Sequence, residues 1–469
     1  MAALRSRRLE ALLGAPVDRL SSEHIEGLVK ASAQEAFDMD YKLTLYGRSD
    51  ADRRALASDV AALANTAGGV IVVGVQEDDQ AQATAAPGVA VSDAEIARMR
   101  QIVASLVSPM PVFDVFSIPK TIDAAVPTSA AGGEAQSVQG YLVVAVPRSP
   151  SAPHAVLVGE SLRYPRRNGA TTRYLSEPEV ATAYRDRMLG ARRQQERIED
   201  VRKDALRRLT VSPRSSWLFL SLVPSLPGEM TISQEMYYEA QRQLVGKRSA
   251  IVHNGVSVQR VQVGHRRLLV DGGVNANGFI DRLSLELHAD GAGTYALRVP
   301  DLHFTRRREL TESDGGSPLP QRLLDDESIV IAIISGLLYL GQHARDRAAA
   351  GGAAALRAEM YPVSPEHPTA IGYSRGGFAE SWTGGEYQYL PPRAAEADAP
   401  LDALAEAGPG LVAAAALLSN ELGQAFGLPE MAQLSPDGRV RHRYWGRAWS
   451  EQVQTWADSA GIEVSDEEL

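Results

Sequence analysis

The chain has 469 residues, of which 44% are hydrophobic, and a formal net charge of −10. Its length predicts two or three domains, and its acidic balance argues against a protein coated with nucleic acid over its whole surface. The sequence contains no cysteine. This excludes disulfides, zinc-thiolate sites and cysteine nucleophiles, and it indicates a reducing, cytoplasmic location.

The first hydrophobic patterns in chain order predict two helices and a buried strand. Apolar residues at helical spacing predict a short helix over 16–31 and a stronger one over 49–66. Gly68 and Gly69 are expected to end the second helix, because glycine readily adopts the left-handed conformation. The following "VIVVGV" predicts a strand covered on both faces. Asn65, Gly68 and Gly69 are therefore predicted to form a structural turn.

Further helix and strand signals lead to a domain boundary. A third helix is predicted from Ser92, and "SVQGYLVVAVPRS" predicts a second buried strand after a flexible insertion at 121–138. A capping box of Ser176 and Glu179 opens a long helix to about Arg208, whose dense charges predict a solvent-facing connector. We predict four parts: a helical segment 1–30, a domain 31–190, a connector 191–214 and a domain 215–469.

The second half of the chain predicts an α+β domain. "SWLFLSLVPS", "QRVQVGHRRLLVDGG" and "RLSLELHADGAGTYALRV" read as strands with glycine turns. The apolar run "IVIAIISGLLYL" is too short to span a bilayer, so a buried element and no membrane partner are expected. "ARDRAAAGGAAALRAEM" predicts a flexible or helical alanine-rich spacer, and residues 409–427 predict an apolar helix.

Acidic side chains flank the predicted strands of the first domain. Glu35, Asp40 and Lys42 precede the helix over 49–66, and Glu77 and Asp78 follow the glycine-rich strand. Acids that converge at strand ends can bind Mg²⁺ or Mn²⁺ and activate water for phosphodiester cleavage. Alternatively, they are ordinary surface carboxylates and Lys42 only pairs with Asp40. The spacing alone favours this second interpretation.

Three segments taken together resemble one family. "EAFDMDYK", "DVAALANTAGGVIVVGVQED" and "YPRRNGATTRYLSEPEV" resemble the Schlafen AlbA_2 domain, over about residues 31–190. That domain shows a Glu, then E-F-K, then A-N-x-x-G-G before a strand ending in G-V, and later an aromatic-Arg-x-G-x-x-T segment. The resemblance implies an α/β (α+β) fold, a mixed sheet with helices, and nucleic-acid binding. A second α+β domain would follow it.

The resemblance also implies candidate catalytic residues. In catalytic Schlafen proteins three metal-binding acids cleave RNA. Here these positions are Glu35, Asp40 and Glu77, with Asp78 as the alternative for the third, and Lys42 falls on the motif lysine. Asp40 stands where the family usually has Glu. The implied cofactor is Mg²⁺ or Mn²⁺.

A basic segment late in the resembling region favours nucleic-acid binding. Arginine forks suit phosphate oxygens, tyrosines stack on unpaired bases, and threonine hydroxyls add donors. The alternative is a solvated loop whose arginines pair with nearby acids. The candidate binding residues are Arg163, Tyr164, Arg166, Arg167, Thr171 and Arg173.

Other motifs carry less weight. "GYSRG" fits the nucleophile elbow G-x-S-x-G around Ser374, but that motif requires a strand before it and a helix after it, and the flanking sequence predicts loop. No H-E-x-x-H or helix-turn-helix pattern is present.

Three functional hypotheses follow. The first is a cytoplasmic, regulatory or defence-related protein that binds DNA or RNA. The second is a metal-dependent endoribonuclease, and the third is a nucleotide-sensing or protein-interaction module. The resemblance further implies a possible homodimer, in which two such domains would complete a groove.

Overall fold

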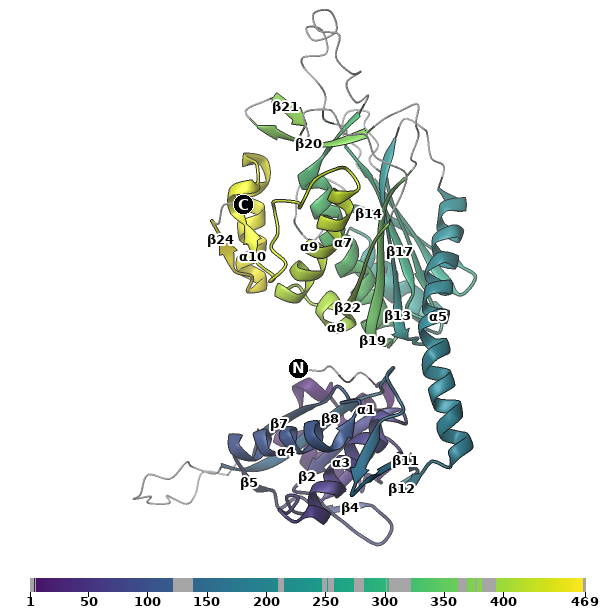
Figure 1. Ribbon diagram of the computed structural model, residues 1–469, viewed down its shortest axis with the longest axis vertical. Helices are drawn as coiled ribbons and strands as arrows, with labels where there is room; N and C mark the ends of the chain where they lie inside the picture. Colours follow the sequence, from purple (N-terminus) through teal and green to yellow (C-terminus); the bar gives the residue numbers. More distant parts are fainter. Residues whose placement is uncertain are drawn as a thin grey trace, which may run out of the picture. The chain divides into compact units, whose positions relative to one another are not determined.

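The computed structural model places most of the chain in two compact units, Met1–Arg192 and Arg193–Leu469 (Figure 1). The described residues are 4, 6–120, 138–209, 215–246, 251, 257–273, 282–300, 302, 322–361, 369–375, 378–381 and 394–466. The predicted insertion at 121–138 falls almost wholly outside these residues.

The first unit is built on a mixed sheet of five strands. Its order is β1-β2-β8-β5, and β7 also pairs with β8. Strands β1 and β2 run parallel, and the other pairs are antiparallel. The strands are β1 (Met39–Lys42), β2 (Gly68–Val73), β5 (Val89–Val91), β7 (Asp114–Pro119) and β8 (Val138–Pro147).

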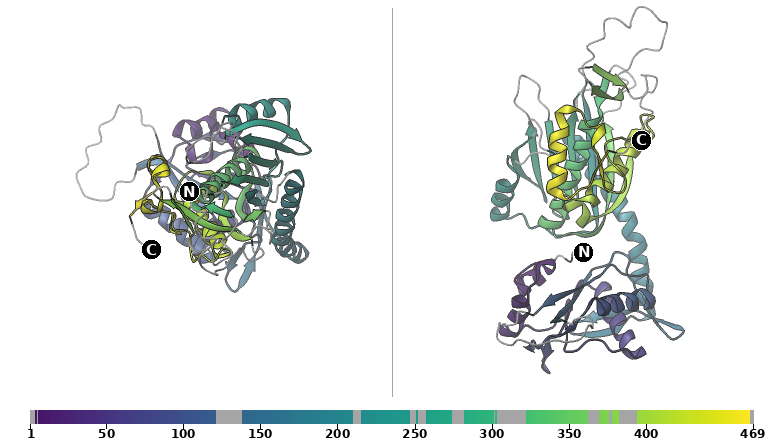
Figure 2. Two further views of the ribbon diagram at one scale, coloured as in Figure 1. Left: turned by 90° about the horizontal axis from the view of Figure 1, so that it is seen from above. Right: turned by 90° about the vertical axis from the view of Figure 1, so that its left-hand side faces the viewer.

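Helices cover both faces of this sheet (Figure 2). Along β2, Ile71 and Val73 pack with the helices α3 (Asp50–Ala64) and α4 (Asp93–Leu106). Val70 and Val72 face the opposite core, formed with α1 (Arg7–Leu13), η1 (Val17–Arg19) and α2 (Ser22–Lys30). This confirms the prediction of a strand covered on both faces. The first thirty residues pack on the same sheet as the rest of the unit.

The glycine pair was predicted to end the helix over 49–66, but in the structure it begins the following strand. Helix α3 ends at Ala64 with Asn65 in a right-handed helical conformation, so no glycine caps it. Gly68 and Gly69 instead begin β2, with φ of +76° and +154°. A Cβ at Gly69 would lie 2.3 Å from the carbonyl oxygen of Asp38 on β1's side of the sheet. The glycines allow neighbouring backbones to approach.

Short strands complete the first unit. β6, β9 and β10 form a small sheet, β3 and β4 form one hairpin, and β11 and β12 form another. Their bounds are β3 (Gln76–Glu77), β4 (Ala83–Ala85), β6 (Val107–Ser108), β9 (Ala155–Val158), β10 (Ser161–Arg163), β11 (Pro165–Asn168) and β12 (Thr171–Tyr174).

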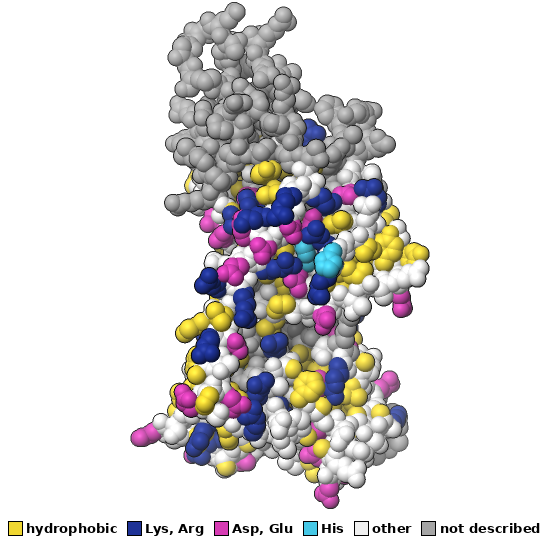
Figure 3. All heavy atoms as spheres, turned by 90° about the vertical axis from the view of Figure 1, so that its right-hand side faces the viewer, with side chains coloured by type: hydrophobic (Ala, Val, Ile, Leu, Met, Phe, Trp, Pro, Cys, Tyr) yellow, Lys and Arg dark blue, Asp and Glu magenta, His cyan; other side chains and the backbone are white. Residues whose placement is uncertain are grey.

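The long helix α5 (Glu177–Arg208) is present as predicted, but its second half is not a solvent-facing connector. Ile198, Val201 and Ala205 are buried against the sheet of the second unit. Arg202 forms an ion pair with Glu359 of that sheet. Figure 3 shows basic and acidic side chains intermixed on the face that α5 covers. The charges of the sequence pattern therefore serve partly as internal ion pairs.

The second unit contains an antiparallel sheet of seven strands in the order β14-β15-β16-β17-β13-β19-β22. Helices α6, α7, α8 and α9 contribute apolar residues to its large core. The strands are β13 (Ser216–Leu226), β14 (Ser257–Gly264), β15 (Arg267–Gly273), β16 (Arg282–His288), β17 (Gly293–Val299), β19 (Gly351–Tyr361) and β22 (Ala395–Pro400). The helices are α6 (Gln234–Leu244), α7 (Asp326–Gln342), α8 (Leu401–Ala405) and α9 (Pro409–Gln424).

Smaller elements close the second unit. A three-stranded sheet consists of β18, β20 and β21, and β23 pairs with β24. These elements are β18 (Arg322–Asp325), β20 (Thr369–Arg375), β21 (Phe378–Ser381), η2 (His343–Arg347), β23 (Val440–Arg441), η3 (His442–Tyr444), α10 (Arg447–Ala460) and β24 (Val464–Ser465).

Two predictions for the second half are wrong. The second half of the alanine-rich stretch, from Gly351, forms the strand β19 and pairs with β13 and β22. The segment from Gly372 to Arg375 belongs to the strand β20, which pairs with β21, where a loop was predicted. The apolar run forms the helix α7. By length and composition the stretch Asp326–Arg347 could cross a membrane, but 83% of its apolar window is buried, as in a core helix.

Candidate nucleic-acid interface

The hairpin β11–β12 carries the basic segment and separates two consecutive arginines. Along β11, Pro165 and Arg167 are buried, whereas Arg166 and Asn168 are exposed. This alternation follows from the period of two in a β-strand. The Arg-Arg pair of the sequence therefore has one side chain in the interior and one in solvent.

Arg167 is fixed in the interior by Asp40. Its guanidinium donates to the Asp40 carboxylate at 2.9 Å, and the two side chains are only 3% and 4% exposed. It also donates to the carbonyl oxygens of Ala36 and Met39, each at 3.3 Å. Arg167 was predicted to contact nucleic acid, but its guanidinium fastens the hairpin to the end of β1.

The end of helix α3 fastens the same hairpin. The amide of Asn65 donates to the carbonyl oxygens of His154 at 2.9 Å and Pro165 at 2.8 Å, and its oxygen accepts from the His154 backbone at 2.7 Å. The hydroxyl of Thr66 accepts from the backbone N–H of Arg167 at 3.0 Å. Asn65 thus joins three segments that are distant in the sequence. Beyond the turn in which it was predicted, Asn65 therefore holds the segments around His154 and Pro165 against the end of α3.

Some of the remaining predicted binding residues form hydrogen bonds or ion pairs within the protein, and others do not. Arg173 forms a two-pronged ion pair with Glu179, at 3.0 and 2.6 Å. The Tyr164 hydroxyl lies 3.2 Å from that of Tyr184, and the Thr171 hydroxyl donates to Asn168 within the turn. Arg163 and Arg166 are exposed. Neither has an ion-pair partner among the described residues, so these two guanidinium groups are available for phosphate.

The acid Asp40 sits in a buried polar cluster. One carboxylate oxygen accepts from Arg167, and the other pairs with the ammonium group of Lys42. Asp59 on α3 accepts from the hydroxyl of Tyr46 at 2.8 Å. Burial, followed by repulsion from Asp40, raises the pKa of Asp59 to about 6. Burial lowers the pKa of Lys42, but Asp40 and Asp59 outweigh it, so that its pKa lies above the usual value.

The other predicted acids lie around this cluster in different roles. Glu35 accepts from the backbone N–H of Tyr41, and burial, then repulsion from Asp40 and Glu77, raises its pKa to about 7. Glu77 is exposed on β3. Asp78 accepts from the backbone N–H groups of residues 80 and 82, both at 2.9 Å, and so shapes the β3–β4 turn.

These acids do not form a fitting site for Mg²⁺ or Mn²⁺ in this conformation. Glu35 is near enough to Asp40 and Glu77 for its pKa to respond to both. Within the described part of the chain, however, no group of three His, Asp or Glu side chains is arranged to hold a metal ion. Both Asp40 oxygens already contact cations, which leaves them poorly placed to coordinate another one.

Sequence reasoning missed Asp59 and Tyr46 in the polar cluster. A signal for Asp59 exists, because it lies three residues after Leu56 and four before Leu63, on the predicted buried stripe of the helix. An acid on a buried stripe implies a polar partner in the interior. Tyr46 offers no comparable pattern.

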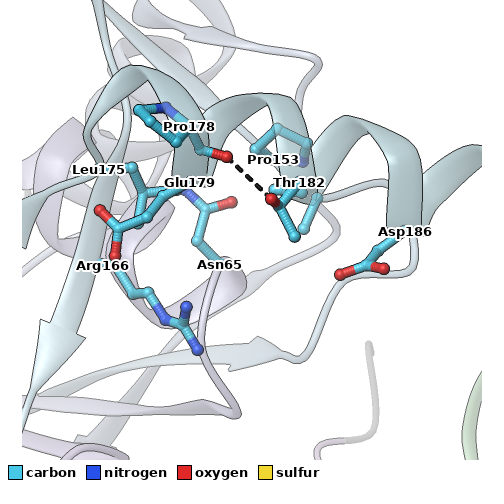
Figure 4. A pocket seen from close by; sticks show the side chains of 10 residues that line it. Asn65, Pro153, Arg166, Leu175, Pro178, Glu179, Thr182 and Asp186 are labelled. Carbon is cyan, nitrogen blue, oxygen red and sulfur yellow. Dashed lines mark hydrogen bonds between the residues drawn. The ribbon is translucent and has the colours of Figure 1, made fainter.

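A hollow beside the hairpin was also missed (Figure 4). It has a volume of about 280 Å³ and lies between the hairpin, the C-terminal end of α3 and the first turns of α5. Its lining residues are Asn65, Ala152, Pro153, Arg166, Leu175, Pro178, Glu179, Thr182, Ala183 and Asp186. The exposed Arg166 thus borders a cavity large enough for a small ligand.

The comparison with family models agrees with the resemblance. Residues 35–176 match the family model described as "Schlafen, AlbA_2". No curated protein matches the chain. Among solved structures, the chain is similar to the crystal structure of the DIP2311 protein from Corynebacterium diphtheriae, with 18% identity and a TM-score of 0.24. That similarity covers 38% of this chain and 29% of the other. Residues 35–176 are therefore a Schlafen AlbA_2 domain, a family linked to nucleic-acid binding.

Proposed function

We propose that the first unit binds nucleic acid through the hairpin β11–β12. The observation that carries this proposal is the separation of Arg166 from Arg167. Arg167 holds the hairpin rigidly, so that Arg166 presents its guanidinium to solvent from a fixed backbone. Pre-organised donors of this kind bind phosphate oxygens with little loss of conformational freedom.

Neighbouring side chains support the same surface. Arg163, on the strand β10 that precedes β11 in the chain, is exposed and adds a second guanidinium. Tyr174 at the end of β12 is 52% exposed and presents a ring on which an unpaired base can stack. The chain as a whole is acidic, so binding relies on this local surface and weakens with salt.

A metal-dependent endoribonuclease is the alternative. The raised pKa of Glu35 favours an active role for the acidic cluster, since perturbed carboxylates often occur at functional sites. The pairing of Asp40 with Lys42 and Arg167 weighs against it, because a metal ion would have to displace both cations. A nucleotide sensor or protein-interaction module is the third possibility, and a homodimer is a separate proposal.

One binding experiment separates these functions. The full chain is titrated into labelled single-stranded RNA, tRNA and duplex DNA, in Mn²⁺ or in EDTA. We expect binding without cleavage in both buffers, with R163Q/R166Q reducing affinity at least tenfold, the order expected for two phosphate contacts. R242Q/R260Q, which removes two arginines from the second unit, is the matched control and should bind like the wild type.

The other outcomes decide between the alternatives. Cleavage that requires Mn²⁺ and disappears in E35Q would establish the nuclease. Binding of mononucleotides alone would support a sensor, and a complete lack of nucleic-acid binding would overturn the proposal. Sedimentation velocity on the same samples checks the homodimer.

A further inference from the structure

Apolar side chains form part of the walls of the hollow beside β11. Pro153 comes from the loop before β9, Leu175 follows β12, and Pro178 and Ala183 belong to α5. Its volume of about 280 Å³ lies near the lower end for ligand pockets, which hold about 300–1,000 Å³. The volume therefore suits one small group, such as a single nucleobase.

Most polar groups on its walls already have partners. The side-chain NH₂ group and the side-chain oxygen of Asn65 both form hydrogen bonds with backbone groups. Glu179 accepts from Arg173 and from Ser176, which lower its pKa to about 2 and keep it ionised. The hydroxyl of Thr182 donates to the carbonyl oxygen of Pro178 at 2.8 Å. These groups shape the hollow and leave little capacity for a ligand.

Two opposite charges on its rim have no such partner. Arg166 comes from β11 and Asp186 from α5, where it follows Pro178 and Thr182 at intervals of four residues on one helix face (Figure 4). Both side chains are exposed, and in the described part of the chain neither forms an ion pair with the other or with a third group. A guanidinium and a carboxylate that flank a hollow suit a ligand with acceptors on one edge and donors on another.

We propose that this hollow binds one unpaired guanine base of a nucleic-acid strand; the inference rests on the proposed function. Guanine presents two acceptors, O6 and N7, on one edge, and arginine is their usual partner. Its adjacent edge presents the N1–H and N2–H donors, which a carboxylate accepts as a pair. Those two donors are free only when the base is unpaired, as in single strands and loops.

The other bases fit these two charges less well. Adenine places an amino donor beside N7, where it would oppose the guanidinium. Its Watson–Crick edge offers an acceptor at N1, which would face the Asp186 carboxylate. Cytosine and uracil are smaller and lack an acceptor pair of the O6/N7 type. Arg166 and Asp186 together therefore select guanine, while Arg163 contributes binding to any sequence.

The test uses the full chain and labelled twelve-nucleotide uridine RNAs that differ at one central position. Guanosine, adenosine, inosine or 7-deazaguanosine occupies that position, and affinity is measured by fluorescence anisotropy. A good bidentate base contact provides roughly tenfold discrimination. We expect the guanosine RNA to bind about tenfold more tightly than the adenosine RNA. Inosine, which lacks the N2 amino group, and 7-deazaguanosine, which lacks N7, should each lose several-fold.

The variants assign these effects to the two side chains. In D186N the preference for guanosine over inosine should vanish, and in R166Q the preference over 7-deazaguanosine should vanish. D200N, which removes an exposed acid of α5 in the second unit, should retain both preferences. Far-UV circular dichroism verifies that each variant folds.

Two results overturn the inference and differ from each other. Equal affinity for the four RNAs, or an undiminished guanosine preference in D186N, would reject the guanine site and leave nucleic-acid binding in place. A lack of binding to every RNA would reject the proposed function together with the site.

Discussion

Each unit of the molecule buries one carboxylate between two cations, and the surroundings of the two carboxylates differ. In the first unit Asp40 pairs with Arg167 and Lys42. In the second, Glu286 on β16 accepts from Arg208 of α5 at 2.9 Å and pairs with Arg267 of β15 at 3.1 Å. Both acids are almost completely enclosed, with 4% and 1% of their side chains exposed.

The cations explain the difference. Lys42 is 33% exposed, but Arg167 is only 3% exposed, and its only acidic partner in the described chain is Asp40. Arg208 and Arg267 are 27% and 25% exposed and have further partners in Asp271 and Asp204. Burial raises the pKa of Glu286, but His288 and the two arginines outweigh it and hold the pKa below its usual value. The second cluster is thus a shared network, whereas in the first cluster Arg167 connects Asp40 to the hairpin β11–β12.

The largest expected effect is the loss of this connection in D40A. Removing one partner of a buried ion pair leaves an uncompensated charge and costs about 3–5 kcal/mol. We expect hydrogen exchange in β2 and β8 to accelerate by the corresponding factor. All five tryptophans belong to the second unit, so the urea transition seen by tryptophan fluorescence should stay unchanged.

D79A is the matched control for this prediction. Asp79 is an exposed acid of the same unit, and its removal should change stability by less than about 0.5 kcal/mol. Unaltered exchange in D40A would show that Arg167 finds other partners and that its connection to Asp40 is not essential.

A smaller effect is expected when E286A breaks the network in the second unit. Arg208 and Arg267 keep partial solvent access and their other acidic partners, so we expect a loss of about 2 kcal/mol. The tryptophan transition in urea measures it directly. A loss as large as that of D40A would mean that exposure of the cations does not decide how much a buried acid contributes.

The stability of the first unit should depend on pH with the opposite sign to the contribution of Glu286. The folded protein raises the pKa of Glu35 from 4.5 to about 7 and that of Asp59 from 3.8 to about 6. The folded state then binds protons more tightly than the unfolded chain, so this contribution is complete below about pH 4 and is lost as the pH rises to about 7.

Glu286 behaves in the reverse way, because its pKa is lower in the folded than in the unfolded state. Its contribution to stability is present at a pH above the usual pKa of a glutamate and is lost as the pH falls through the folded-state pKa. Hydrogen exchange of β2 between pH 4.5 and 7.5, corrected for intrinsic rates, measures the first trend. E35Q should reduce this slope and leave the part due to Asp59, and an identical slope in E35Q would contradict the assignment to Glu35.

The sequence could predict the elements around the site and the family, because these depend on local patterns. The apolar repeats of α3 and α4 and the β-branched run of β2 are strong periodic signals. The motif residues Glu35, Asn65 and Arg167 fall in the family segment. Each of these features is carried by residues close together in the chain.

The tertiary arrangement of the site could not be predicted, because it depends on pairs more than a hundred residues apart. Asp40 and Arg167 are separated by 127 positions. No local pattern says which of two adjacent arginines turns inward, since the register of β11 depends on its contacts with Asn65 and Thr66. The hollow bordered by Asp186 likewise forms only when α5, α3 and the hairpin meet.

The smallest effect on stability is expected at Arg166, and there the comparison becomes functional. Arg166 directly precedes Arg167 but is exposed, and its side chain forms no ion pair or hydrogen bond within the described part of the chain. R166Q should therefore change stability by less than about 0.5 kcal/mol. It should nevertheless weaken binding of single-stranded RNA and reduce the salt slope of log K by about 0.7, the value for one phosphate contact on a single strand.

R167Q, at the neighbouring position, should instead affect mainly stability. It should destabilise the unit by about 3 kcal/mol, since it leaves Asp40 buried with Lys42 alone. If R166Q destabilised the unit as much as R167Q, the two arginines would share one structural role, and the proposal that Arg166 is free to bind phosphate would be rejected.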